Sequence, residues 1–304
     1  IDTADVYGGG ISEKVIGKFL KTRSETLYVA TKLGRRGDNG NGWPQNFTYE
    51  AIKQHVEDSL QNLQLEQLYL EQLHCIPTEE LQKGDVCAVI IEPIQGVGGL
   101  DQGTTEFFQA LEKICDQYNV VLILDEVQSG YGRSGKFFAH QWVKGLVPDL
   151  ITMAKGMGNG FPIGGVLINP DFKPKYGMLG TTFGGAYLAC AAAIAVLDVI
   201  KQERLMENAT AMGKYLVESL QGIEGIKEIR SLGLMTGIEL NFAADSIRKM
   251  LLLKHHMFTG SASNKNTLRI LPSLTVSKVE IDLFVNALQS SIKEYYNEAV
   301  SIGA

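Results

Sequence analysis

The sequence has few cysteines and no long apolar segment. Its four cysteines, Cys75, Cys87, Cys115 and Cys190, are scattered along 304 residues, without the density of a disulfide-stabilised domain. Neither they nor the five histidines have the spacing of metal ligands, so no metal site is predicted. No stretch approaches the roughly 20 apolar residues that span a bilayer, and no signal peptide opens the chain. These absences predict a cytoplasmic protein without a membrane partner.

The chain also has no excess of basic charge. It carries 28 Lys and Arg against 34 Asp and Glu, a net charge of −6, which argues against a nucleic-acid partner. At about 150 residues per domain, its length predicts about two domains. There is no methionine at position 1, and Ile1 resembles the end of a strand. We therefore expect the chain to lack its true N-terminus.

Glycine, by contrast, is abundant and clustered. The chain has 33 glycines, nearly 11% of 304 residues, and 18 of them lie within residues 84–190, whereas the average fraction is about 7%. Glycine is needed where the backbone turns sharply or approaches a ligand closely. This distribution predicts a small-molecule site in the middle third of the chain, although ordinary loops would also use these residues.

Strand and helix patterns alternate along the chain, which predicts an α/β protein with parallel strands. Apolar strands are expected at Val86–Ile91, Val120–Leu124 and Leu150–Ala154, with a helix at Phe107–Tyr118 between the first two. The polar segment 75–85 precedes them and is a candidate domain boundary.

In the first 83 residues, reactive side chains follow three strand patterns. They are Asp2 with Tyr7, then Lys32, then His74. Barrel enzymes place their chemistry at the carboxyl ends of strands, and a lysine beside a tyrosine lowers the pKa of the phenol, which can then act as a general acid. The alternative is that these are solvated loop residues.

The segments Asp2–Gly8, Ala30–Lys32 and Leu73-His74 resemble the aldo-keto reductases. The resemblance implies a β/α fragment of a TIM barrel at residues 1–83, with Asp2, Tyr7, Lys32 and His74 as a catalytic tetrad for NADPH-dependent reduction. The cofactor-binding segment of that family lies near the end of its barrel, and nothing after residue 85 continues the resemblance.

A second pair of residues lies in the glycine-rich part. Asp125 follows a buried strand, and Lys155 follows the next strand, thirty residues further on. Ligands of α/β sheets bind beyond the carboxyl ends of the strands, so both side chains are expected in one crevice. A lysine can form a Schiff base with an aldehyde cofactor, and an aspartate can keep a pyridine nitrogen protonated, as pyridoxal phosphate requires. The alternative is again a pair of solvated residues.

The motifs Ile91–Gly96, Asp125–Gly135 and Ala154–Gly156 resemble the class III pyridoxal-phosphate aminotransferases, above all those of acetylornithine and succinylornithine. The resemblance covers residues 86–304. It implies part of a fold type I transferase, with an incomplete large-domain sheet at residues 86–205 and a small C-terminal α+β domain at residues 206–304.

The same resemblance implies a role for each matching residue. Lys155 would be the Schiff-base lysine and proton shuttle, and Asp125 the partner of the pyridine nitrogen. The other matches are Val127 packing on the ring, Gln128 bonding the phenolic oxygen, Thr182 reaching the phosphate of the neighbouring subunit in a homodimer, and Arg269 binding a substrate carboxylate.

Two features depart from the aminotransferase pattern. Val97 stands where many relatives carry a glutamate that masks an arginine, and the family's Gly-Thr phosphate loop is missing before Val86. The sequence therefore predicts a chimera that transfers an amino group from an N-acylornithine-type donor to 2-oxoglutarate, a 2-oxo acid. Two alternatives stay open: an NADPH-dependent reductase, and a non-catalytic fragment that is inactive because it is truncated.

Overall fold

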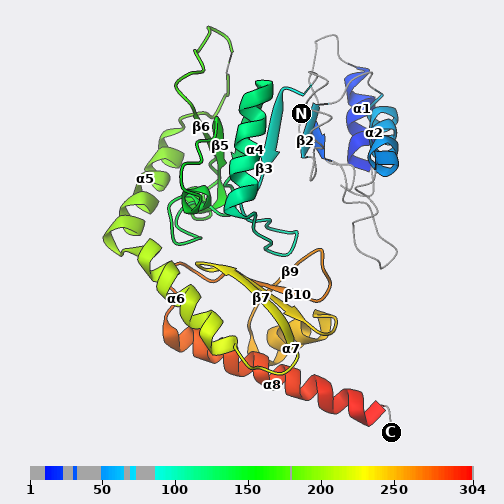
Figure 1. Ribbon diagram of the computed structural model, residues 1–304, viewed down its shortest axis with the longest axis vertical. Helices are drawn as coiled ribbons and strands as arrows, with labels where there is room; N and C mark the ends of the chain where they lie inside the picture. Colours follow the sequence, from blue (N-terminus) through cyan, green and yellow to red (C-terminus); the bar gives the residue numbers. More distant parts are fainter. Residues whose placement is uncertain are drawn as a thin grey trace. The chain divides into compact units, whose positions relative to one another are not determined.

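The computed structural model describes residues 11–22, 30–32, 49–64, 69–72, 86–178 and 180–302 (Figure 1). The chain divides into two units. One contains residues 1–91 and 113–123, and the other contains residues 92–112 and 124–304. Helices and strands occur in both, so the predicted α/β class is confirmed.

Among the described residues before β3, the first unit has two helices and a pair of parallel strands. Helices α1 (Ile11–Leu20) and α2 (Tyr49–Leu63) pack together. Strand β1 (Ala30–Lys32) pairs in parallel with β2 (Tyr69–Gln72), and α2 lies between them in the chain. Parallel strands joined through a helix occur in barrels and in open sheets alike, so this unit does not distinguish the two. The TIM-barrel fragment stays a prediction.

The central sheet has the strand order β3-β4-β5-β6. Its members are β3 (Ala88–Ile91), β4 (Val121–Asp125), β5 (Leu150–Met153) and β6 (Gly165–Ile168), and α4 (Thr105–Tyr118) connects the first two. Strand β3 belongs to the first unit, and the division between the units passes through β4. The first three strands and α4 confirm the predicted elements to within two residues.

The expectation of parallel strands is wrong for β5 and β6. These strands are antiparallel, with Leu150 opposite Ile168 and Met153 opposite Gly165. The physical reason lies in their connection, residues 154–164, which contains only the short 3-10 helix η3 (Lys155–Met157). A parallel return needs a longer crossover, usually through an α-helix.

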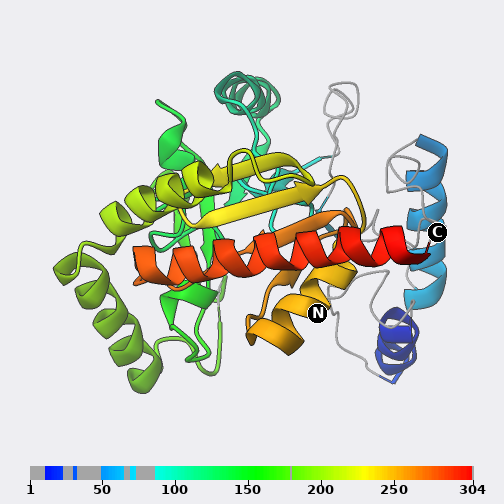
Figure 2. The ribbon, with the colours of Figure 1, turned by 90° about the horizontal axis from the view of Figure 1, so that it is seen from below.

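The C-terminal part is an antiparallel sheet of order β7-β8-β10-β9. Helices α6, α7 and α8 pack on it and enclose one apolar core, which includes Leu216, Ile238, Ile247 and Leu288 (Figures 1 and 2). The bounds of the elements in this part of the chain are α5 (Tyr187–Gln202), α6 (Leu205–Leu220), β7 (Ile226–Leu232), β8 (Met235–Leu240), α7 (Asp245–His255), β9 (Gly260–Ser261), β10 (Thr267–Ile270) and α8 (Lys278–Ile302).

Two glycines allow α6 to cross the turn between β7 and β8. A Cβ on Gly213 would lie 1.9 Å from the carbonyl oxygen of Gly233. Gly233 itself has a φ of +57°, and a Cβ there would lie 2.7 Å from the carbonyl oxygen of Arg133. Because neither position has room for a side chain, the helix, the turn and the Arg133 segment come into backbone contact.

A charge network ties the segment after β3 to this sheet. Arg230 of β7 forms ion pairs with Glu239 (2.8 Å), Glu228 (2.6 Å) and Asp101 (3.2 Å), and its Nε also donates to the carbonyl oxygen of Gly99 at 3.0 Å. Lys227 donates to the other oxygen of Glu239 at 2.7 Å. Glu239 is almost fully buried, so its charge depends on these two partners.

This network makes the stability of the C-terminal part depend on pH. The hydrogen bond from Lys227, supported by Arg230, holds the pKa of Glu239 below its ordinary value of 4.5. The stabilisation is therefore present in full at pH values above the ordinary pKa of 4.5, which applies to the unfolded chain. It is lost as the pH falls through the lowered pKa of the folded chain.

We expect Glu239→Gln to lower the free energy of unfolding by about 2 kcal/mol at pH 7, and by much less at pH 3, in urea titrations at the two pH values. Glu207→Gln, whose carboxylate is exposed and meets only Arg204 at 3.4 Å, is the control and should change little at either pH. An equal loss at both pH values for Glu239→Gln would contradict the prediction.

Candidate active site

Asp125 is the last residue of β4, and its carboxylate is held by one oxygen. Oδ1 accepts hydrogen bonds from the backbone N–H of Val127 (3.0 Å) and from Oγ1 of Thr152 in β5 (3.2 Å). Within the described residues Oδ2 accepts no hydrogen bond, so the carboxylate is oriented and has one oxygen left for a ligand. The bond to Thr152 also places the end of β4 beside β5. That the side chains of Asp125 and Lys155 share one crevice stays a prediction.

Lys155 follows β5 in a strained backbone conformation. Its φ is +43°, a left-handed conformation that costs a non-glycine residue on the order of 1 kcal/mol or more. Its side chain is exposed, and within the described part of the chain Nζ has no hydrogen-bond or ion-pair partner. Strain of this kind is commonly found at functional sites, where surrounding contacts hold it.

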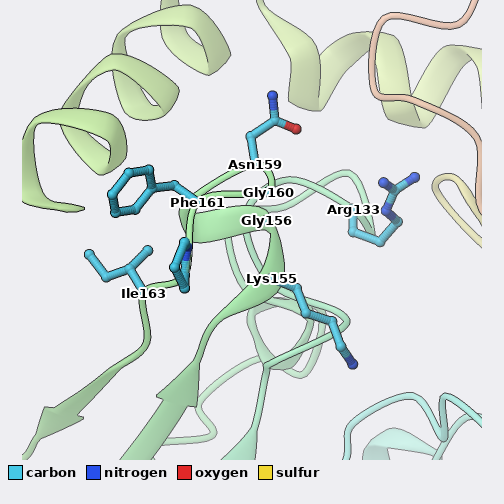
Figure 3. A pocket seen from close by; sticks show the side chains of 8 residues that line it. Arg133, Lys155, Gly156, Asn159, Gly160, Phe161 and Ile163 are labelled. Atoms are coloured by element: carbon cyan, nitrogen blue, oxygen red, sulfur yellow. The ribbon is translucent and has the colours of Figure 1, made fainter. Parts of the chain in front are cut away.

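A pocket of about 480 Å³ lies at this turn and is lined by Lys155, Arg133 and residues of the segment 156–163. In Figure 3, Lys155 and Arg133 lie on one side of the loop, and Phe161 and Ile163 on the other. Beneath the turn, the position of a Cβ on Gly156 is 3.1 Å from Cβ of Tyr131. Burial raises the pKa of the Tyr131 phenol, whose hydroxyl lies 3.7 Å from Sδ of Met153. Tyr131 and Met153 therefore pack beneath the turn at Gly156, next to the lysine in sequence.

Gln128 lies in the turn after β4, and its buried side-chain oxygen has no hydrogen-bond partner among the residues that the structure describes. The site of a Cβ on Gly96 is only 2.0 Å from this oxygen, so a side chain at position 96 would displace the Gln128 amide from this position. The N–H of Gly96 donates to Oε2 of Glu92 at 2.8 Å. An unpaired buried acceptor costs free energy, and a donor on a bound ligand would remove that cost.

Arg269, in β10, also contacts Gly96. Its Nη1 donates to the carbonyl oxygen of Gly96 at 2.9 Å, and its Nε donates to the carbonyl oxygen of Ser261. The next carbonyl, that of Val97, accepts from the N–H and the hydroxyl of Ser263 at 2.8 and 2.9 Å. The structure therefore brings Gln128 and Arg269 together at Gly96, although Arg269 lies more than 100 residues from both of them in sequence.

Arg133 is a lining residue that the sequence did not single out. Its Nη1 donates to the carbonyl oxygens of Pro272 and Leu234, the latter at 3.4 Å, and burial lowers the pKa of its guanidinium to about 10. It belongs to the same glycine-rich motif as Asp125. Its place between Gly132 and Gly135 is the feature of the sequence that could have predicted it as a site residue.

Among the described residues, Lys155 is the one predicted site residue that lines this pocket; Asp125, Gln128 and Arg269 are not part of its lining. Val127 is half-buried in the turn, and Thr182 is exposed between β6 and α5 and does not line the pocket. Lys32 ends β1 in the first unit. Asp2, Tyr7 and His74 lie outside the described residues.

The described residues hold neither a metal-binding cluster nor a membrane-spanning helix. No group of three or more His, Cys, Asp or Glu in that part of the chain could hold a metal ion. Over the same residues, no helix has the length and apolar character needed to cross a membrane.

Comparisons with known proteins identify the family of the chain. A family model described as Aminotransferase class-III matches residues 39–292. The chain belongs to the class-III aminotransferases. It is 42% identical over 217 residues to an acetylornithine aminotransferase of Caldanaerobacter subterraneus, covering 69% of this chain and 54% of the relative. It is 40% identical over 224 residues to ornithine aminotransferase 1 of Staphylococcus saprophyticus, covering 71% and 56%.

A solved structure agrees as well. Plasmodium falciparum ornithine delta-aminotransferase matches with a TM-score of 0.65 and 32% identity, covering 73% of this chain and 59% of that one. The chain thus spans about half the length of the curated class-III relatives it matches. The predicted resemblance to the class-III aminotransferases is confirmed, with likeness to acetylornithine and ornithine enzymes. The predicted likeness to the succinylornithine enzymes stays a prediction.

The family match also bears on the predicted chimera. It begins at residue 39, so it overlaps the segment 1–83 that the sequence assigned to an aldo-keto reductase. That overlap removes residue 83 as the limit of the aminotransferase similarity. The reductase segment and the chimera gain no support and stay predictions, as does an NADPH site.

Class-III aminotransferases use pyridoxal phosphate, and the residues present fit this cofactor. With respect to the described residues, Asp125 offers one oriented carboxylate oxygen, Lys155 an unpaired amine at the pocket, and Gln128 a buried amide oxygen without a donor.

Proposed function

We propose that this class-III chain binds pyridoxal phosphate at the ends of β4 and β5 and supports transamination of the acetylornithine or ornithine type. One observation carries the proposal: Asp125 is fixed through Oδ1, with Oδ2 left for a ligand, beside the strand that leads to Lys155. The names of the relatives support the donor class, and 2-oxoglutarate is the acceptor implied by the resemblance.

Asp125, Lys155 and Arg269 would have different roles in the reaction. When bound, pyridoxal phosphate supplies an electron sink that stabilises negative charge on the carbon bearing the amino group. Asp125 Oδ2 would hold the proton on the pyridine nitrogen, because a carboxylate favours the charged form of a neighbouring cation. Lys155 Nζ would bind the cofactor and then carry a proton to and from the substrate carbon. Arg269 would exchange the carbonyl oxygen of Gly96 for a substrate carboxylate.

The proposal includes a homodimer. Within the described part of the chain β6 is an edge strand, and its Val166, Leu167 and Ile168 are about half exposed. Tyr187 and Leu188, at the start of α5, are 93% and 76% exposed. Exposed apolar groups along a sheet edge favour association. Light scattering should give twice the mass of the chain, and a monomer would contradict this part of the proposal.

The deciding experiment is a titration of the purified chain with pyridoxal phosphate. We expect a visible absorption band that borohydride fixes to the peptide containing Lys155. If no band appears, or if borohydride fixes the cofactor elsewhere, the proposal is wrong. A band without turnover of acetylornithine or ornithine would support the inactive, truncated alternative.

A further inference from the structure

Glu126, next to Asp125, is buried and fully hydrogen-bonded. It is 1% exposed, and both carboxylate oxygens are in use. Oε2 accepts from the hydroxyl of Ser129 (2.5 Å) and the N–H of Ala139 (3.0 Å). Oε1 accepts from the N–H of His140 (2.8 Å) and lies 3.0 Å from its Nδ1. A buried carboxylate is tolerated when all its acceptor sites are filled in this way.

These bonds join the turn after β4 to the segment that begins at Ala139, 13 residues further along the chain. Glu126 begins the turn after β4, which its own carbonyl closes by accepting from the N–H of Gly130 at 2.9 Å. Its carboxylate accepts hydrogen bonds from the first two backbone N–H groups of η2 (Ala139–Trp142). The His140 ring there stacks on Phe138. The turn that carries Val127 and Gln128 is therefore clamped at Glu126 and Ser129 to a segment ten residues further on.

A neutral side chain could not make the same clamp. Glutamine has one acceptor oxygen, and its NH₂ group would face the N–H of Ala139, donor against donor. Apolar side chains often give as much stability as a buried charge. The contribution specific to this carboxylate is therefore the position that its hydrogen bonds give to the turn. The neighbouring groups that need this position are Asp125 Oδ2 and Gln128 Oε1.

We propose that Glu126 is a positioning residue for the cofactor site. It touches no ligand itself. It holds the turn so that Asp125 and Gln128 present their oxygens in a fixed geometry. The inference rests on the proposed function, since its benefit is the binding of pyridoxal phosphate.

The test compares Glu126→Gln with Glu112→Gln. Glu112 accepts one backbone hydrogen bond, from Val147 at 2.7 Å, and is not part of the turn. In the absence of cofactor, amide exchange in residues 126–142 should quicken in Glu126→Gln and not in Glu112→Gln. In the titration, the dissociation constant for pyridoxal phosphate should rise at least about tenfold for Glu126→Gln only. At saturation, its visible band should also shift in position or in pH midpoint, and Glu126→Asp should partly restore both.

The outcomes separate the two proposals. If wild-type chain binds no pyridoxal phosphate, the proposed function fails and this inference fails with it. If wild-type chain binds, but folded Glu126→Gln binds with unchanged affinity, band and pH midpoint, the proposed function stands and this inference is wrong. A loss of stability alone, with normal binding by the folded fraction, would likewise overturn the positioning role.

Discussion

Replacing Lys155 with glycine is expected to abolish the visible band of bound pyridoxal phosphate and to make the cofactor-free chain more stable. Glycine has no amine to bind the cofactor or to carry a proton, so turnover should fall by at least about 10³-fold. Glycine also adopts the φ of +43° at this position without strain. After the entropy that glycine adds to the unfolded chain, we expect a gain of about 0.5 to 1 kcal/mol in the free energy of unfolding.

The matched control is Asn159→Gly in the same loop. Asn159 has a φ of +46° and lines the same pocket. Asparagine tolerates this conformation better than lysine, so its replacement should give a smaller gain in stability and leave the band in place. Urea titrations without cofactor and absorption titrations with it measure both effects. Destabilisation by Lys155→Gly, or a band that survives it, would contradict the prediction.

The strands of the central sheet could be predicted because their sequences are apolar and short. The predicted strands at Val86–Ile91, Val120–Leu124 and Leu150–Ala154 appear as β3, β4 and β5. Strand β6 was not predicted, since Gly165–Ile168 has no alternation and its side chains are largely exposed. Its antiparallel direction depends on the short connection from β5, which is a property of the chain path rather than of residue pattern.

At the site, the roles of Asp125 and Lys155 could be proposed because both follow strands. The clamp at Glu126 could not, since it depends on Ala139 and His140 more than ten residues away. The contact of Arg269 with Gly96 depends on the pairing of β10 with β8 and β9, and it joins residues far apart in the chain. Side-chain partners of this kind follow from tertiary packing.

The aldo-keto reductase prediction depended on a few short motifs. Of the four residues proposed for it, only Lys32 is described, at the end of β1, and its position there fits any parallel pair of strands. The aminotransferase prediction depended on strand ends, glycine spacing and three motifs within one stretch. Agreement at several levels gives a sequence pattern more weight than a good local match.

The second large effect is expected from Asp125→Asn. The variant should keep its fold, because asparagine retains an oxygen in the place of Oδ1 to accept from Val127 and Thr152. We expect the free energy of unfolding to change by about 0.5 kcal/mol or less. Turnover should nevertheless fall by at least about 10²-fold, because a neutral amide does not hold the proton on the pyridine nitrogen.

This separation of stability from activity is what distinguishes a cofactor partner from a structural aspartate. A residue whose importance lay in its bonds to Val127 and Thr152 would be replaced by asparagine without loss of activity, since those bonds survive. Rates of single turnover with saturating amino donor, measured beside urea unfolding, give both quantities. Asp198→Asn, at an exposed position of α5, is the control and should alter neither. If Asp125→Asn retains the wild-type rate with cofactor bound, then Oδ2 does not hold the ring nitrogen and the proposed site is wrong in its central contact.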